Sequence, residues 1–144
     1  MDIFELHKGD WTLSTDPARL DMNAVVGFLA RAYWASNRPR ATIEKSIKNS
    51  LNVGVYKNGA QIAYCRVVTD YATFAWLCDV FVDETHRGDG VSKWMLAGVM
   101  AHPELQDLRR WLLATRDAET LYARYGFAPL ATPERWMEIL NQSV

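Results

Sequence analysis

The feature that most constrains this 144-residue chain is the stretch from Phe74 to Ala97, where an apolar run leads into a glycine loop and an amphipathic segment. The run FAWLCDVFV has the composition of a buried strand. The loop Arg87-Gly88-Asp89-Gly90-Val91-Ser92 then opens a segment of helical periodicity. N–H groups at a helix start have no acceptor in the helix and lie at the positive end of its dipole, which favours a phosphate. The two glycines let a ligand approach the backbone closely.

This loop fits neither of the two common phosphate-binding patterns. The dinucleotide fingerprint needs a third glycine where Lys93 stands, and the P-loop ends in Gly-Lys-Ser/Thr, whereas this chain has Ser92-Lys93. Taken alone, a glycine turn that only caps a helix is an equally good interpretation.

In context, the loop resembles the acyl-CoA-binding loop of the GNAT superfamily of N-acyltransferases, whose pattern is Gln/Arg-x-x-Gly-x-Gly/Ala. Arg87 and Gly90 match this pattern, and Ser92 stands at the final small position. A second segment, Ala118-x-x-Leu121-Tyr122-x-x-Tyr125-Gly126-Phe127, is similar to the family's A-x-x-(F/L)-Y-x-x-x-G-F. The resemblance covers residues 51–130 well.

Length and composition predict one domain over residues 1–144 with an ordinary packed core. Sixteen basic and seventeen acidic residues leave a net charge of −1, so no global charge favours nucleic acid or an anionic membrane. No apolar run is long enough to span a bilayer, and the N-terminus lacks the apolar core of a signal peptide. We therefore expect a cytoplasmic protein.

The two cysteines, Cys65 and Cys78, lack metal-ligand spacing. A turn centred on Tyr71-Ala72 would place them opposite each other on antiparallel strands, so a cross-strand disulfide is conceivable. In a reducing cytoplasm we expect buried free thiols instead. The three histidines are scattered, and no metal site is expected: His7, His86 and His102.

The order of elements predicts an α/β (α+β) fold with a mixed sheet. Asn58-Gly59 is typical of a type I′ hairpin turn, and Asp21 is a good helix N-cap. Strands are expected over residues 4–7, 11–14, 51–56, 61–68, 74–82, 110–114, 127–130 and 136–140. Helices are expected from Asp21 and over 42–49, 91–100 and 117–125. This layout resembles that of the GNAT fold, a mostly antiparallel central sheet flanked by helices, which implies a parallel strand pair that splays apart.

The resemblance implies a bound acetyl-CoA, with CoA as product, whose pantetheine arm enters the gap between the splayed strands. Backbone groups of Phe81 and Val82 would bind this arm and the thioester oxygen. Thr115 stands where the family often has an asparagine that contacts the arm. The pyrophosphate would lie on the glycine loop and helix start, formed by Arg87, Gly88, Asp89, Gly90, Val91, Ser92 and Lys93. Surface cations that contact only solvent are an equally good interpretation of Arg87 and Lys93.

Acyl transfer from a thioester needs a neutral amine, a stabilised oxyanion and a proton for the leaving thiolate. Tyr122 holds the family's tyrosine position and is our candidate proton donor; the alternative is a core tyrosine. Tyr125 is assigned to packing. Asp79, the only carboxylate within the run 74–82, is a candidate general base or a carboxylate paired with a cation, and Glu119 is a weaker candidate base.

The acceptor is expected to contact the segment between the first two helices and the Asp70–Thr73 turn. If the arginines of that segment point inward, they favour an acceptor with a carboxylate or phosphate. The residues concerned are Tyr33, Trp34, Arg38 and Arg40.

These observations predict an N-acetyltransferase that transfers acetyl from acetyl-CoA to a primary amine in a ternary complex. The acceptor would be a small-molecule amine or an amine of a peptide or protein. One alternative is a catalytically inactive acyl-CoA-binding module of the same fold, and another is an unrelated nucleotide-binding domain. Both a monomer and a homodimer remain open.

Overall fold

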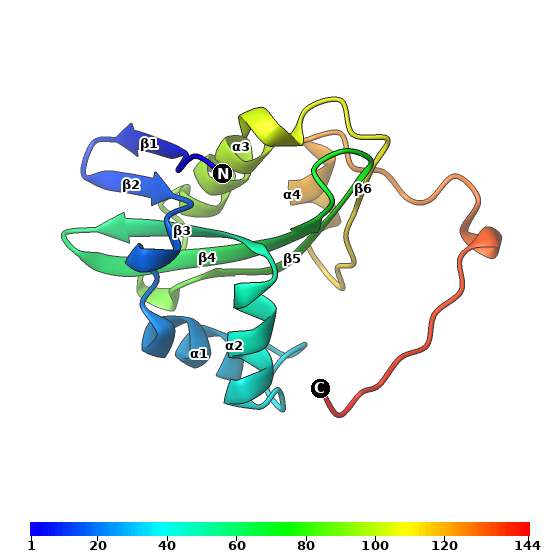
Figure 1. Ribbon diagram of the computed structural model, residues 1–144, viewed down its shortest axis with the longest axis horizontal. Coiled ribbons are helices and arrows are strands. Elements are labelled where there is room, and N and C mark those ends of the chain that lie inside the picture. Colours follow the sequence, from blue (N-terminus) through cyan, green and yellow to red (C-terminus); the bar gives the residue numbers. More distant parts are fainter.

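The computed structural model describes all 144 residues, and its centre is a six-stranded sheet with helices on both faces (Figure 1). The strands lie in chain order, antiparallel from the first to the fifth, while the fifth and sixth are parallel. They are β1 (Glu5–Lys8), β2 (Trp11–Ser14), β3 (Leu51–Lys57), β4 (Ala60–Thr69), β5 (Phe74–Val82) and β6 (Arg110–Leu112). The predicted mixed, mostly antiparallel sheet with one parallel pair is confirmed.

Four α-helices flank this sheet: α1 (Met22–Ala30), α2 (Arg40–Lys48), α3 (Val91–Met100) and α4 (Glu119–Ala123). The Asp21 carboxylate caps α1 by accepting from the Ala24 N–H, as its sequence predicts. Helix α3 begins and ends where its periodicity places it. None of the helices has the length and apolar character needed to cross a membrane.

The β3–β4 hairpin has the turn that its sequence requires. Asn58 and Gly59 have φ angles of 52° and 82°, the two positive values of a type I′ turn. The register set by this turn shifts by one residue at a β-bulge between Tyr56 and Val55, and beyond it the buried side chains of β3 and β4 reach the core on each face of the sheet.

Each face of the sheet has its own apolar core. Helices α1 and α2 cover one face, where Phe28 stacks on Phe81 with ring centroids 5.2 Å apart. Helix α3 covers the other face and lies close to β2 at Gly98, where a Cβ atom would come within 2.6 Å of Leu13. The absence of a side chain at Gly98 therefore sets how closely α3 packs on the sheet.

A β-bulge interrupts the pairing of β4 with β5. Arg66 lies opposite Cys78 and Tyr64 opposite Phe81, so Asp79 and Val80 share the space opposite one residue of β4. Asp79 has a φ of +55°, and the bulge turns its side chain to the face already used by Cys78. The predicted placement of Cys65 opposite Cys78 is therefore wrong, and both thiols are free, as expected.

The parallel pairing of β5 with β6 covers only three residues of each strand, from Phe74 opposite Arg110 to Trp76 opposite Leu112. Beyond Trp76 the two strands separate. The edge of β5 from Cys78 to Val82 thus has no neighbouring strand, and its backbone groups on that side are open.

The C-terminal part differs most from the prediction. The strands expected over 127–130 and 136–140 do not form, because no strand of the same chain lies beside them. The helix expected over 117–125 is limited to α4, and β6 ends at Leu112 rather than residue 114. Residues 127–144 form an extended arm that leaves the sheet, makes a short helical turn at Pro133–Arg135 and returns toward α1 and α2 (Figure 1).

Candidate functional site

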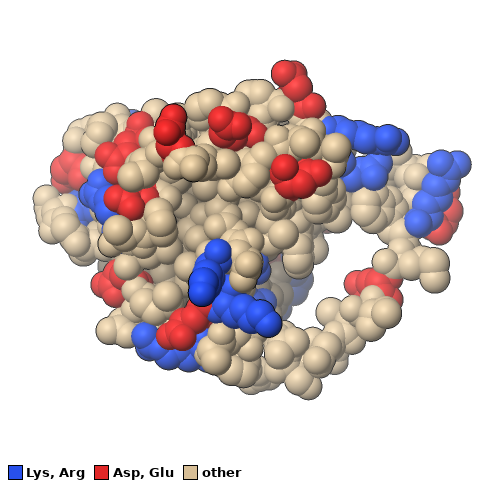
Figure 2. Space-filling model, viewed as in Figure 1, with Lys and Arg blue, Asp and Glu red and all other residues tan.

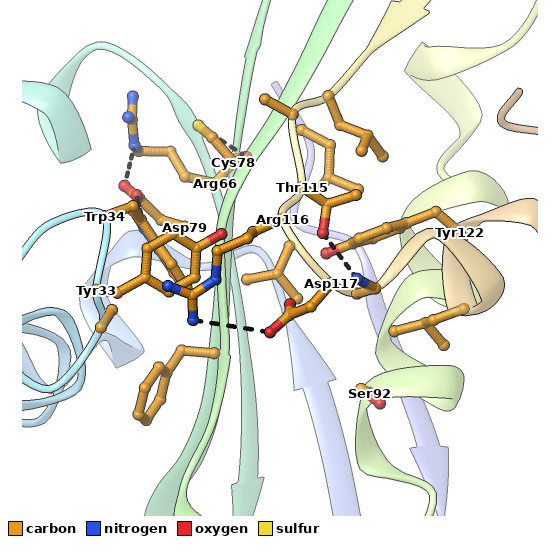
Figure 3. A pocket seen from close by; sticks show the side chains of 18 of the residues that line it. Tyr33, Trp34, Arg66, Cys78, Asp79, Ser92, Thr115, Arg116, Asp117 and Tyr122 are labelled. Carbon is orange, nitrogen blue, oxygen red and sulfur yellow. Dashed lines mark hydrogen bonds and ion pairs between the residues drawn. The ribbon is translucent and has the colours of Figure 1, made fainter. Parts of the chain in front are cut away.

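A cavity of about 890 Å³ opens where β5 and β6 separate (Figure 3). One wall is the β5 edge, and the other is the segment from Leu113 to Ala118 together with α4. Most of the sequence-predicted site residues line it: Tyr33, Trp34, Arg38, Asp79, Phe81, Val82, Arg87, Ser92, Thr115 and Tyr122. The fold thus brings together side chains from four separate parts of the chain.

The glycine loop borders this cavity through Arg87 and Ser92. No hydrogen bond within the protein satisfies the N–H groups from Gly88 to Lys93, and α3 starts without a side-chain cap. Gly90, with φ +86°, is the N-cap, and open space surrounds the position of its missing Cβ. The loop therefore presents a row of free donors at the positive end of α3, as an anion-binding helix start does.

The side chains of this loop differ in what they do. The Arg87 Nε donates to the Val82 carbonyl at 3.0 Å, so this guanidinium covers the last open carbonyl of β5. Lys93 and Asp89 are exposed, whereas the Val91 side chain is buried in the core. The side chain of Val91 is thus committed to packing, and only its N–H group remains for a ligand.

The backbone N–H groups of the two residues expected to bind the pantetheine arm, Phe81 and Val82, point to opposite sides of β5. The Asp83 N–H donates to the Ile62 carbonyl of β4. Because successive residues of a strand point their N–H groups to opposite sides, Phe81 also faces β4 while Val82 faces the cavity. Val82 is therefore the available donor, and Phe81 contributes its side chain, packed against Phe28.

Tyr122 projects from α4 toward the cavity, on the side opposite β5 (Figure 3). Its ring packs edge-on against Phe127, with centroids 6.1 Å apart. Burial raises the pKa of Tyr122 to about 12, so its hydroxyl holds its proton at neutral pH. The neighbouring Tyr125 instead donates to the Lys93 carbonyl at 2.7 Å and joins α4 to α3, the packing role expected of it.

Asp79 lies on the other wall, and its carboxylate is fully paired. It accepts from the Arg66 Nε at 2.9 Å, from the Arg38 Nη1 at 3.1 Å and from the Trp34 indole at 3.0 Å. Burial alone would raise the pKa of Asp79, but the two guanidinium groups outweigh burial and hold it below its ordinary value. These contacts favour the cation-paired interpretation, and a general base at Asp79 stays a prediction without support.

At the acceptor end, Tyr33 and Trp34 line the cavity beside Arg38. Arg40 does not; it pairs with Glu44 at 3.0 Å on the surface of α2. The Asp70–Thr73 turn also contributes no residue to the cavity. Of the expected acceptor residues, only the segment after α1 is thus in place.

Three arginines of the site were not among the predicted residues: Arg31, Arg66 and Arg116. Arg116 lies across the cavity mouth, with its guanidinium carbon 3.8 Å from the centroid of the Tyr33 ring. Arg66 is the only charged residue of β4. A lone cation in one buried strand and a lone carboxylate, Asp79, in the next were a usable sequence signal, because opposite charges in neighbouring buried strands tend to pair.

Thr115 and Cys78 complete the lining. The Thr115 Oγ1 accepts from the Ala118 N–H at 3.1 Å and so shapes the turn into α4, while its hydroxyl proton stays free to donate. Burial raises the pKa of the Cys78 thiol to about 12, which leaves little thiolate for nucleophilic attack.

Comparison with known proteins gives a family match and several similar structures. Residues 49–129 match the family model of the acetyltransferase (GNAT) domain. A candidate acetyltransferase of Gibberella zeae is 30% identical over 140 residues, covering 81% of this chain and 78% of that protein. A crystal structure of a candidate GNAT-family acetyltransferase from Xanthomonas campestris pv. campestris is 45% identical, with a TM-score of 0.91 over 96% of this chain and 98% of that one. The structure of a candidate acetyltransferase from Clostridium acetobutylicum with acetyl-CoA shares the fold at 13% identity, with a TM-score of 0.63 over 96% of this chain and 95% of that one.

Proposed function

Because the chain belongs to the GNAT acetyltransferase family, we propose that it transfers an acetyl group from acetyl-CoA to a primary amine in a ternary complex. The observation that carries this proposal is the opening between β5 and β6. It joins a row of unpaired N–H groups on the glycine loop to a protonated tyrosine, Tyr122, inside one cavity.

The residues present fit the donor. The free N–H groups from Gly88 to Lys93 suit a pyrophosphate, and the open N–H of Val82 suits a carbonyl oxygen of a pantetheine arm. When bound, acetyl-CoA supplies the thioester whose carbonyl carbon an amine attacks, with CoA as the leaving group. The free N–H of Val82 would then be a donor to the carbonyl oxygen.

The protonation states of Tyr122 and Asp79 support one proton-transfer role in the cavity. Tyr122 holds a proton on its hydroxyl oxygen at neutral pH and faces the β5 edge, which supports a role in giving that proton to a departing sulfur. Asp79 already accepts from three donors, and taking up a proton there would weaken two ion pairs. The attacking amine therefore gives its proton to water rather than to this carboxylate.

The charges at the acceptor end favour an amine that also carries an anionic group. Asp79 is matched by Arg66 and Arg38, so it does not attract a third cation. Arg38 contacts Asp79 through one terminal nitrogen only, which leaves its other donors for a ligand. Arg116 adds a further guanidinium at the mouth. A small amine with a carboxylate or phosphate fits these groups better than a polycation.

Thermal unfolding with acetyl-CoA, CoA and ATP in turn tests the donor. A ligand at about 100 times its Kd adds about 2.7 kcal/mol of stability, a visible rise in Tm. The Gly90→Glu variant places a carboxylate in the loop and should lose the rise. Gly59→Glu is the matched control, because Gly59 has a similar φ of +82° in a distant hairpin turn. It should be destabilised alike but keep the full response to ligand.

Turnover with a panel of amines, followed by CoA release, tests the chemistry. Stabilisation by both CoA species together with turnover supports the transferase. Stabilisation without turnover across the panel would indicate a non-catalytic acyl-CoA-binding module. Stabilisation by ATP but by neither CoA species would overturn the assignment of the loop.

A further inference from the structure

Trp76 is the one exposed residue of β5, with 42% of its surface open to solvent. Its backbone lies inside the sheet, because β5 pairs there with Val68 of β4 and with Leu112 of β6. Its neighbours Ala75 and Leu77 are buried in the core beneath α3. Since side chains alternate along a strand, the Trp76 indole points to the opposite face of the sheet. It is a large flat apolar surface that no part of the protein covers completely.

Trp76 lines the cavity between β5 and β6 at the end away from the glycine loop. The pair Trp76–Leu112 is the last one before the two strands separate, so the opening begins at this tryptophan. From there β5 runs to Val82, and the glycine loop follows. A donor whose phosphates lie on that loop enters from the Val82 end. The Trp76 end is therefore left for the acceptor.

Of the three aromatic side chains in this part of the cavity, only Trp76 has no partner within the protein. Trp34 donates its indole N–H to Asp79 and packs edge-on against Tyr33, with ring centroids 5.1 Å apart. Arg116 covers the Tyr33 ring at 3.8 Å, and Figure 3 shows these side chains together. No aromatic ring or cation of the protein stacks on Trp76. The face of a free indole binds either a flat apolar group or a cation.

The charges around Trp76 favour the flat apolar group over a cation. The charged residues that line the cavity are mainly arginines: Arg31, Arg38, Arg66, Arg87 and Arg116, beside Asp79 and Asp117. The Arg116–Asp117 contact is 3.8 Å long, with 64% and 68% of the side chains exposed, so it neutralises Arg116 only weakly. Figure 2 shows basic side chains beside the opening between the arm and the body of the protein. These groups repel a second cation and attract an anion.

Building on the proposed function, we propose that Trp76 selects the acceptor, and that this acceptor is an amine with a flat apolar group and a carboxylate, as in an aromatic α-amino acid. The flat group would stack on the Trp76 indole, and the carboxylate would pair with Arg38 or Arg116. Transfer forms the amide bond to the acceptor nitrogen and breaks the carbon–sulfur bond of acetyl-CoA. The amine gives up one proton to water, and the leaving sulfur gains one through Tyr122.

Steady-state kinetics with phenylalanine, alanine and 2-phenylethylamine tests the selection. The wild-type kcat/KM for phenylalanine should exceed that for each of the other two amines by at least about tenfold, because each lacks one of the two recognised groups. Trp76→Ala should lower the value for phenylalanine to that for alanine, whereas Trp76→Phe retains a ring and should keep most of the preference. Trp136→Ala is the matched control, since Trp136 is 36% exposed and lies outside the cavity. It should behave as the wild type.

Calorimetric titration of phenylalanine into the complex with CoA gives a second measurement that does not depend on turnover. Trp76→Ala should bind phenylalanine at least about tenfold more weakly than the wild type, with an unchanged Kd for CoA. Equal affinity in the two proteins, or a wild type that binds CoA and does not distinguish phenylalanine from alanine, would overturn the role of Trp76 and leave the proposed function standing. A wild type that binds no CoA would overturn the proposed function itself.

Discussion

The Arg66 guanidinium and the Asp79 carboxylate form an ion pair of 2.9 Å across β4 and β5, with 11% and 2% of their side chains exposed. The pair exists because of the bulge: an unbroken β5 would point residue 79 to the face covered by α3. With φ +55°, Asp79 turns instead to the face of α1, where Arg38 and Trp34 also reach it. One local irregularity thus joins the acceptor segment to the central strand.

Replacement of Asp79 by alanine should lower the free energy of unfolding by about 3–5 kcal/mol, because two partly buried guanidinium groups lose their counter-charge. Urea denaturation measures this change. Glu44→Ala, which removes an exposed pair with Arg40, is the control and should cost no more than about 0.5 kcal/mol. Similar costs for the two variants would show that the buried network contributes little.

The same network predicts a pH dependence of stability. The pKa of Asp79 is lower in the folded protein than its ordinary value of 3.8. Its stabilisation is therefore complete above about pH 4 and is lost as the pH falls through the lower, folded pKa. Urea midpoints of the wild type and Asp79→Asn, measured from pH 7 downward, should converge only in that acidic range. Convergence as the pH rises would contradict the sign of the shift.

Tyr122→Phe should lower kcat by about a hundredfold while the Kd for acetyl-CoA stays within about twofold, since only the proton donor is removed. With the pKa of Tyr122 raised to about 12, the wild-type rate should show no loss from tyrosine ionisation below pH 10. Steady-state kinetics and a CoA titration measure both quantities.

Tyr56→Phe is the matched control, because Tyr56 is buried outside the cavity and its hydroxyl has no partner. It should leave kcat unchanged and the protein as stable as the wild type or slightly more so. An equal loss of kcat in both variants would assign the effect of Tyr122 to packing.

The sequence predicted those parts of the fold that local residues determine. Asn58-Gly59 has few alternatives to a type I′ turn, and Asp21 and the glycine loop define two helix starts. The bulge at Asp79 was not predictable in this way, because register depends on which side chains two strands bury together. For the same reason the pairing of Arg66 with Asp79 became visible only once both strands were in place.

The arm shows a different limit of sequence-based prediction. Its pattern over residues 136–140 is that of a strand, but a strand forms only where another strand lies beside it, and this chain offers none there. The residues of the site also differ in how far the sequence predicts them. The loop and Tyr122 were found from contiguous motifs, whereas Arg116 reaches the cavity from a segment without regular structure and lacks any such motif.

Arg116 should determine the preference for anionic acceptors. In a matched pair of amines that differ only in a carboxylate and its amide, kcat/KM should be about tenfold higher for the carboxylate. Arg116→Gln should remove this difference by lowering kcat/KM for the carboxylate while leaving the amide unchanged, because a neutral side chain at the mouth binds both alike. Arg124→Gln, an exposed arginine outside the cavity, should keep the preference. If both variants keep it, the anionic group lies deeper, at Arg38; if the wild type prefers the amide, the acceptor end does not select by negative charge.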